Sequence, residues 1–445
     1  MRPLWKKPLA ASVTLYAAQL LVALLLPAWL ISKLGADGYV QATFLFLLIN
    51  PASWTGQAHL VNSRLLARMG RSGDFSRRLA LFATGHRIYW IFLTIILAGA
   101  GVIWEMNWSK PWILIALAPL PFLIERAFRR VYQAQKEGNI ALSQWIPAAW
   151  LILWVLFLAL MSQWIATLEA MLVATWLVVL AGAFLAPSLP ALKRIRVKHQ
   201  ASFILLAFAG ILVPQIDKLI IQSHLSWEEA AYFWVPLGLL MKFPALLEII
   251  QKAFLSRIAS NQATHVPLIR RSLLLIGVAV PATSFWLSAF LSLLISADFA
   301  SQAGKVTQLL LALFGPALLL GMAQTLYYAR QGSKANGLFM LVGLFHLLGT
   351  WYGATVGLEW VSLGFASEAL AGQGLLIYLL RKEKDRISYL SWGAFWGASL
   401  APLFLPSLTG TLAIIAFAAH SFLVFFTLFI LIKSNEDSTL ATLWN

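Results

Sequence analysis

Residues 387–432 form a stretch of 46 positions that contains no Asp, Glu, Lys or Arg. A bilayer core about 30 Å thick is crossed by roughly 20 apolar helical residues, so this stretch is long enough for two crossings. The composition agrees, because the chain is 60% hydrophobic and only 11% charged, whereas soluble domains are usually about a quarter charged. The sequence therefore predicts an all-α polytopic membrane protein.

The same alternation of long uncharged blocks and short basic clusters runs through all 445 residues. The first apolar block, residues 8–31, is long enough to span and has no small-residue cleavage site, so it is interpreted as a span and not as a cleavable signal peptide. About fourteen spans of roughly 20 residues are predicted. They cover approximately residues 8–32, 39–60, 86–104, 112–133, 141–163, 168–188, 201–223, 229–254, 271–296, 304–328, 336–356, 360–380, 389–408 and 410–432.

The basic residues predict the orientation of these spans. Of the 33 Lys and Arg residues, 28 fall at the two termini and in the even-numbered gaps between spans, and only Lys33, Lys110 and Lys305 fall in odd-numbered gaps. Cytoplasmic loops carry the excess of Lys and Arg, so both termini are expected to be cytoplasmic. The net charge of +16 is explained by this asymmetry and by contact with anionic lipid, and no nucleic-acid partner is expected.

The sequence offers little for an enzyme. It contains no Cys, which excludes disulfides, cysteine nucleophiles and thiolate metal sites. It also contains no Gly-x-x-x-x-Gly-Lys-Ser/Thr phosphate loop and no metal-ligand spacing, so no cofactor or metal and no direct ATP coupling within this chain are expected. A membrane glycosyltransferase or polymerase with Asp37 as its acid remains an alternative, but the short outer loops argue against it.

Two segments that begin at Leu30 and Leu219 share an order of features. Each has the end of one span, a short acidic loop, a Tyr that opens the next span, a Pro in that span and a closing Leu-x-Arg. The matched positions are Tyr39 with Tyr232, Pro51 with Pro244, and Arg68 with Arg257. This order predicts an internal duplication.

The duplication predicts the domain organisation. Six spans precede and six follow a basic linker at residues 191–200, so the halves are expected to be parallel repeats: an N-terminal six-helix lobe at 1–190 and a C-terminal six-helix lobe at 201–381. An additional helix pair follows at 387–433. Transporters built from repeats place the substrate path between the two halves.

Several motifs together resemble a family. The first span ends in LGADGY, the seventh contains PQIDKLIIQ, and AAYFW and LSRIA follow it. This pattern resembles the polysaccharide flippases, the O-antigen and exopolysaccharide transporters of the multidrug/oligosaccharidyl-lipid/polysaccharide (MOP) exporter superfamily. Two features depart from it, since LSWEEAAY has no Gly after its Leu and Lys218 directly follows the family-like Asp217.

The resemblance implies a function. Such a protein would flip undecaprenyl-diphosphate-linked oligosaccharide from the cytoplasmic to the outer leaflet of a bacterial inner membrane, for surface polysaccharides such as the O-antigen of lipopolysaccharide. Its partners would be membrane lipids and other polysaccharide assembly proteins. A multidrug or toxic-compound antiporter of the same superfamily is the alternative, and it should favour an anionic cavity.

Five basic residues are candidates for binding the diphosphate. Lys242 lies close to mid-membrane, where snorkelling to water is difficult, so it needs a wet cavity or an acidic partner. Lys218 lies in the outer half of its span and can also be explained as an interfacial, snorkelling cation. Arg64, Arg68 and Arg257 end matching spans and can form a basic vestibule, although positive-inside topology would also leave them there.

Three carboxylates are candidates for ion coupling. Asp217 and Glu368 lie within predicted spans, where an ionisable group usually faces a cavity or a partner. Glu248 lies deeper toward the cytoplasm and can instead pair with Lys252 one helical turn away. The coupling ion can be a proton or Na⁺, and transport can also be driven by substrate flow alone.

Overall fold

The structure is a computed structural model of residues 1–445. It describes residues 140–185, 216–241, 276–331 except 278, 336–380, 389–404 and 411–420, together with residues 25–40 and a few single positions. Within these residues every regular element is a helix and no strand occurs, so the predicted all-α class is confirmed. The count of fourteen spans stays a prediction.

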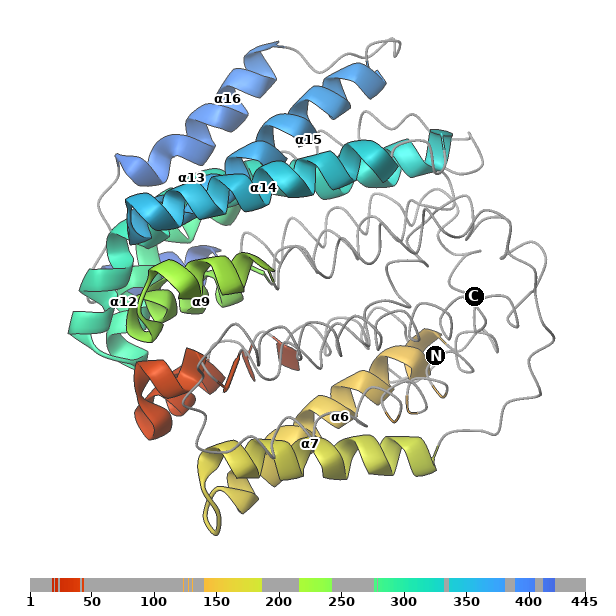
Figure 1. Ribbon diagram of the computed structural model, residues 1–445, viewed down its shortest axis with the longest axis vertical. Coiled ribbons are helices and arrows are strands. Elements are labelled where there is room, and N and C mark those ends of the chain that lie inside the picture. Colours follow the sequence, from red (N-terminus) through yellow and green to blue (C-terminus); the bar gives the residue numbers. More distant parts are fainter. Residues whose placement is uncertain are drawn as a thin grey trace, which may run out of the picture. The chain divides into compact units, whose positions relative to one another are not determined.

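The described part of the chain consists mainly of helices (Figure 1). Their bounds are α6 Ile140–Met161, α7 Thr167–Phe184, α9 Trp227–Leu240, α12 Ser284–Leu294, α13 Ala297–Gln331, α14 Asn336–Val356, the 3₁₀-helix η3 Leu358–Leu363, α15 Gly364–Leu380, α16 Tyr389–Leu400 and the 3₁₀-helix η4 Ala401–Leu403. Residues 25–40, 216–224 and 411–420 are also helical.

The chain divides into two compact units, Met1–Gln215 and Ile216–Asn445. In the first unit α6 packs against α7, and the indole Nε1 of Trp154 donates to Thr175 Oγ1 at 2.9 Å across this contact. The boundaries of the predicted lobes and of the linker at 191–200 lie outside the described residues, so that organisation stays a prediction.

The second unit is organised around α13, which packs against α9, α12, α15, α16 and η3. Its side chains at Leu310, Leu311 and Leu319 are completely buried. Fully burying a leucine stabilises a fold by about 1.5–3 kcal/mol relative to leaving it exposed. Long apolar stretches in α13 and α15 therefore supply the core on which the polar groups of this unit are positioned.

Glycines bring α14 unusually close to η3 and to the start of α15. A Cβ on Gly349 would lie 3.0 Å from the carbonyl oxygen of Leu363, and one on Gly353 would collide with the backbone of Trp360. A Cβ on Gly364 would collide with Thr350 Oγ1. These three glycines fix the spacing between α14 and the segment that follows it, because any larger residue would force the backbones apart.

The helix bounds test the predicted spans. The prediction of 336–356 is confirmed by α14, Asn336–Val356. The prediction of a loop between 296 and 304 is wrong, because α13 already begins at Ala297. Ser296 explains the difference, since its hydroxyl accepts from the backbone N–H of Phe299 at 3.1 Å and satisfies a free donor of the first turn.

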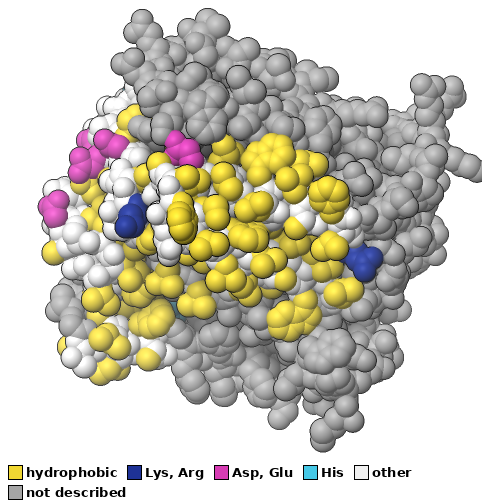
Figure 2. Space-filling view, turned by 90° about the horizontal axis from the view of Figure 1, so that it is seen from below, with side chains coloured by type: hydrophobic (Ala, Val, Ile, Leu, Met, Phe, Trp, Pro, Cys, Tyr) yellow, Lys and Arg dark blue, Asp and Glu magenta, His cyan; other side chains and the backbone are white. Residues whose placement is uncertain are grey.

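Three described helices are long and apolar enough to cross a membrane: Thr167–Phe184, Ala297–Gln324 and Gly337–Val356. Shorter apolar helices occur at Trp145–Met161, Ala279–Leu294 and Thr411–His420. Figure 2 shows a face on which the described side chains are mostly hydrophobic, with acidic side chains gathered at one end. The hydrophobic part of this surface suits contact with lipid.

Candidate functional site

Asp217 and Lys218 lie at the beginning of the described helix 216–224. The helix ends at His224, where Ser226 caps the next helix: its hydroxyl accepts from the N–H of Glu229, and the carboxylate of Glu229 accepts from the N–H of Ser226. This reciprocal arrangement is a capping box, which fixes where α9 starts. The helix that carries Asp217 is therefore followed by a sharply defined turn into α9.

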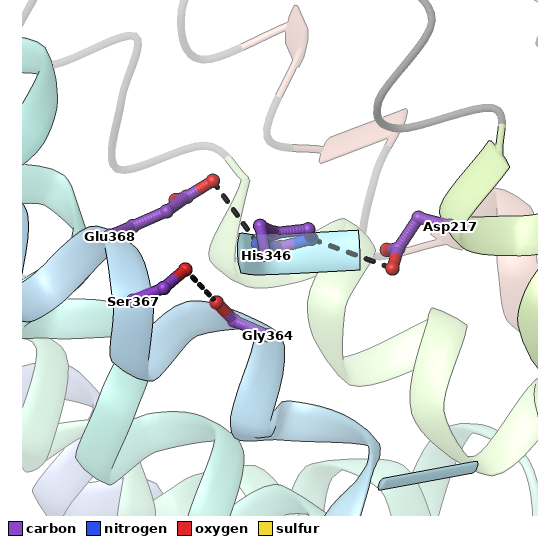
Figure 3. A network of polar contacts seen from close by, with 5 residues as sticks. All are labelled: Asp217, His346, Gly364, Ser367 and Glu368. Carbon is purple, nitrogen blue, oxygen red and sulfur yellow. Dashed lines mark hydrogen bonds and ion pairs between the residues drawn. The ribbon is translucent and has the colours of Figure 1, made fainter. Parts of the chain in front are cut away.

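Asp217 points at a histidine that comes from a different helix. His346, in the middle of α14, lies between two carboxylates (Figure 3). Its Nε2 is 3.4 Å from Asp217 Oδ1, and its Nδ1 is 3.2 Å from Glu368 Oε1 in α15. Three ionisable side chains from three segments thus form one line, which we call the acid–histidine–acid cluster.

The cluster is largely withdrawn from solvent. The side chains of His346 and Asp217 are 5% and 9% exposed, and that of Glu368 is 25% exposed. The ring of Phe365 packs edge-on against the imidazole at 5.1 Å between centroids, and Gly364 leaves room for it, since a Cβ there would be 3.2 Å from His346 Cε1. The ring of Phe365 thus packs against the imidazole, and Gly364 leaves the space that the imidazole occupies.

Proton counting limits the states of this cluster. Each of its two contacts needs one proton, but a neutral imidazole donates from only one nitrogen and an ionised carboxylate only accepts. Both contacts are satisfied only if the histidine is charged or one carboxylate is protonated. As arranged, Asp217 Oδ1 and His346 Nδ1 are buried without a hydrogen-bond partner among the described residues, so the two close approaches lack hydrogen-bond alignment.

Lys218 faces another direction. Its ammonium lies 5.7 Å from the centroid of the Trp234 ring in α9, within the range of a cation–π contact. Neighbouring helix positions point about 100° apart, so Asp217 can contact the cluster while Lys218 contacts the aromatic ring.

The structure thus brings two of the predicted coupling residues together. Asp217 and Glu368 share one histidine, and Ser367 beside Glu368 donates back to the carbonyl of Gly364 at 2.9 Å. Their coupling role stays a prediction. The remaining candidates, Lys242, Arg64, Arg68, Arg257 and Glu248, lie outside the described residues.

His346 was not among the site residues predicted from the sequence. One signal was present, because it is the only imidazole or charged group in the predicted span 336–356, and such groups inside a membrane usually face partners. The partner identities were not accessible, since Asp217 is far away in the sequence and only the packing of three helical segments brings the groups together.

A second buried histidine has different surroundings. His420, at the end of the helix 411–420, accepts a hydrogen bond at Nδ1 from the indole Nε1 of Trp286 in α12 at 2.9 Å. The rings of Phe417 and Phe290 lie 4.9 Å and 5.7 Å from that of Trp286. We call this group the tryptophan–histidine pair; it joins residues 411–420 to α12.

Comparisons with known proteins place the fold. No protein-family model matches the sequence, and none of the curated proteins is a significant match. Among solved structures, the chain is similar to an outward-facing multidrug resistance MATE family transporter of the MOP superfamily, with a TM-score of 0.56 and 13% identity over 85% of this chain and 97% of that chain.

Two further structures agree. A MATE protein in complex with MaL6 gives a TM-score of 0.54 at 13% identity, covering 85% of this chain and 97% of that one. A MOP superfamily transporter from Pyrococcus furiosus gives 0.53 at 13% identity, covering 95% and 98%. The chain therefore has the helical fold of the MATE and MOP transporters.

Proposed function

We propose that this protein is a membrane transporter that works by alternating access and couples transport to an ion gradient at the acid–histidine–acid cluster. One observation carries the proposal: three ionisable side chains from three helical segments meet midway along an apolar helix. The fold shared with MATE and MOP transporters supports it.

Burying three ionisable side chains together costs folding free energy. Removing charges from water costs several kcal/mol per ion even after relaxation, and a purely apolar core of the same volume is often as stable. His346 lies ten residues from the end of α14 at Val356, about 15 Å along the helix axis. Ionisable groups at that depth typically mark proton relays and ion pathways in pumps and transporters.

For the substrate we propose a lipid-linked oligosaccharide, moved from the cytoplasmic to the outer leaflet. The support is the motif resemblance and the cations at Lys218 and Lys242 within predicted spans, because a diphosphate needs cationic partners along its path. Arg64, Arg68 and Arg257 would form the cytoplasmic vestibule. On this proposal the protein serves surface polysaccharide assembly in a bacterial inner membrane.

The second candidate is export of cationic drugs, favoured by the likeness to a multidrug resistance MATE transporter. A cell assay separates the two. Expression in a bacterium lacking its own oligosaccharide flippase should restore surface glycan if the first proposal holds, whereas resistance to cationic dyes without restored glycan would support the second. Lys242→Ala, with protein amount checked by immunoblot, should abolish glycan export, and Lys242→Arg should keep part of it.

Coupling is tested in proteoliposomes that contain a fluorescent lipid-linked oligosaccharide. Asp217→Asn and Glu368→Gln should make transport insensitive to imposed proton and Na⁺ gradients while substrate binding is retained. Glu359→Gln is the matched control, because Glu359 is also a carboxylate of this unit but is half exposed and pairs with Lys305 at 3.4 Å. Equal wild-type rates with and without both gradients would reject coupling and indicate a facilitator driven by substrate consumption.

A further inference from the structure

We propose that the ion exchanged at the acid–histidine–acid cluster is a proton, and that His346 carries it between Glu368 and Asp217. This inference rests on the proposed function, because it takes the cluster to be the coupling site. It goes further by choosing between proton and Na⁺ and by naming the carrier.

The imidazole of His346 occupies the space in which a metal cation would have to bind. Hard cations are bound by shells of oxygen ligands. Here the space between the two carboxylates is filled by the ring of His346, with one nitrogen toward each carboxylate (Figure 3). In the part of the chain that the structure describes, no group of three or more His, Cys, Asp or Glu side chains is arranged to hold a metal ion. A proton needs no such shell.

The number of protons in the cluster decides how many of its contacts are hydrogen-bonded. With two protons in the cluster, both contacts are filled; with one, a nitrogen lone pair faces a carboxylate oxygen. Within the cluster, Asp217 Oδ1 and His346 Nδ1 are buried without a hydrogen-bond partner among the described residues. Both contacts, at 3.4 Å and 3.2 Å, exceed the 2.7–2.9 Å of charge-assisted bonds. One proton gained or lost therefore makes or breaks a contact between helices.

The three side chains of the cluster differ in their exposure to solvent. Glu368 is the most exposed member at 25% of its side chain, while His346 and Asp217 are 5% and 9% exposed. A proton arriving from water would thus reach Glu368 first, pass to the imidazole, and be shared with Asp217 at the buried end. The transfer breaks one O–H bond and forms one N–H bond, and the second ring nitrogen can release its proton to Asp217.

The surrounding charges leave this assignment intact. Lys218, next to Asp217, is directed at Trp234. Glu359, on the 3₁₀-helix packed against α14, is paired with Lys305. Among the described residues, Asp217 and Glu368 are thus the charged groups that contact the imidazole.

Glycine packing indicates which contact can open. Gly364 and Gly349 hold α15 and α14 at close range, so the geometry between Glu368 and His346 is fixed by the backbone. Asp217 comes from the separate helix 216–224. Loss of a proton should therefore separate Asp217 from His346, which would let that helix move relative to α14 and α15.

The test uses full-length protein with isotope-labelled histidine in lipid nanodiscs. Infrared difference spectra are recorded between about pH 5 and about pH 11, a range wide enough for imidazole and carboxyl groups that are shifted by their neighbours. We expect a histidine-ring band and a carboxyl band that are both lost in His346→Gln and retained in His420→Gln. Replacing KCl by NaCl at constant pH and ionic strength should change neither the spectrum nor the melting temperature of the wild-type protein.

Two results would overturn the inference. One is retention of both bands in His346→Gln; the other is a Na⁺-induced carboxyl change that Asp217→Asn and Glu368→Gln abolish, which would make the cluster a Na⁺ site. If His346→Gln does not fold, these two carboxylate variants decide, since each should move the midpoint of the histidine band by about one pH unit and an unmoved midpoint rejects the relay. The spectra need no transported substrate, so proton exchange without transport would reject only the proposed function.

Discussion

His346 and His420 are both buried, with 4% and 8% of their surface exposed, yet their surroundings are opposite. His346 has a carboxylate oxygen beside each ring nitrogen, whereas His420 accepts from an indole N–H and lies among aromatic rings. A carboxylate pair can share a proton with the imidazole, while a Trp N–H only donates. Burial of a histidine therefore says little about its role; the chemistry of its neighbours decides whether it exchanges protons or joins helices.

The largest expected effect is a difference in transport rate between variants of His346 and of His420. His346→Gln should lower gradient-driven transport in proteoliposomes by about tenfold or more, because it removes the imidazole that lies between the two carboxylates and shares a proton with them. His420→Gln should stay within about twofold, since a glutamine oxygen can still accept from Trp286. Equal losses of transport in both variants would show that the two histidines do not differ in role.

A smaller effect is expected from a change that removes no charge. Gly364→Ala would press on Thr350 Oγ1 and on His346 Cε1, and such overpacking typically costs about 1–3 kcal/mol. We expect a lower melting temperature and partial loss of transport. The control is Gly374→Ala in the same helix, where the added Cβ meets no atom within 4 Å. If both variants transport like the wild type, the close packing at Gly364 is irrelevant to the cluster.

The tryptophan–histidine pair should affect stability alone. His420→Leu removes the acceptor of the Trp286 N–H and should cost about 1–2 kcal/mol, within the range for hydrogen bonds between membrane helices. Thermal unfolding of His420→Leu, Trp286→Phe and the double variant forms a cycle. Strictly additive losses would mean that the hydrogen bond contributes nothing of its own.

The smallest effect belongs to the exposed ion pair. Lys305 and Glu359 are 78% and 51% exposed at their side chains, and exposed pairs are typically worth less than about 1 kcal/mol because water and salt screen them. Lys305→Met should leave transport unchanged and move the melting temperature only slightly. A loss as large as that of His346→Gln would show that burial is not what distinguishes the cluster.

Much of the fold was predictable from hydropathy, because an apolar span has to satisfy its backbone internally as a helix. The predicted span 336–356 and α14 have the same bounds. The start of α13 was missed because a single capping residue, Ser296, extends the helix into a segment with Asp298 and Lys305, which hydropathy assigns to a loop.

The site was predictable only in part. Asp217 and Glu368 stood out because a carboxylate inside an apolar span is rare. His346 did not, since an imidazole is less polar than a carboxylate and gives no hint of its partners. The contact of Asp217 with His346 depends on tertiary packing, and the close approach of α15 to α14 depends on small residues such as Gly364. Local sequence patterns encode neither.

The lengths of α13 and α14 have a consequence for the lipid. The apolar part of α13, Ala297–Gln324, has 28 residues and is about 42 Å long, well beyond a hydrocarbon core of about 30 Å. Since 72% of its 18-residue apolar window is buried inside the protein, neighbouring helices cover most of that window. Gly337–Val356 in α14 has 20 residues, about 30 Å, which matches the bilayer. Only 33% of its 18-residue apolar window is buried. Lipid acyl-chain length should therefore affect the tilt of α14, the helix that carries His346. A change in membrane thickness would then alter the position of His346 relative to its two carboxylates.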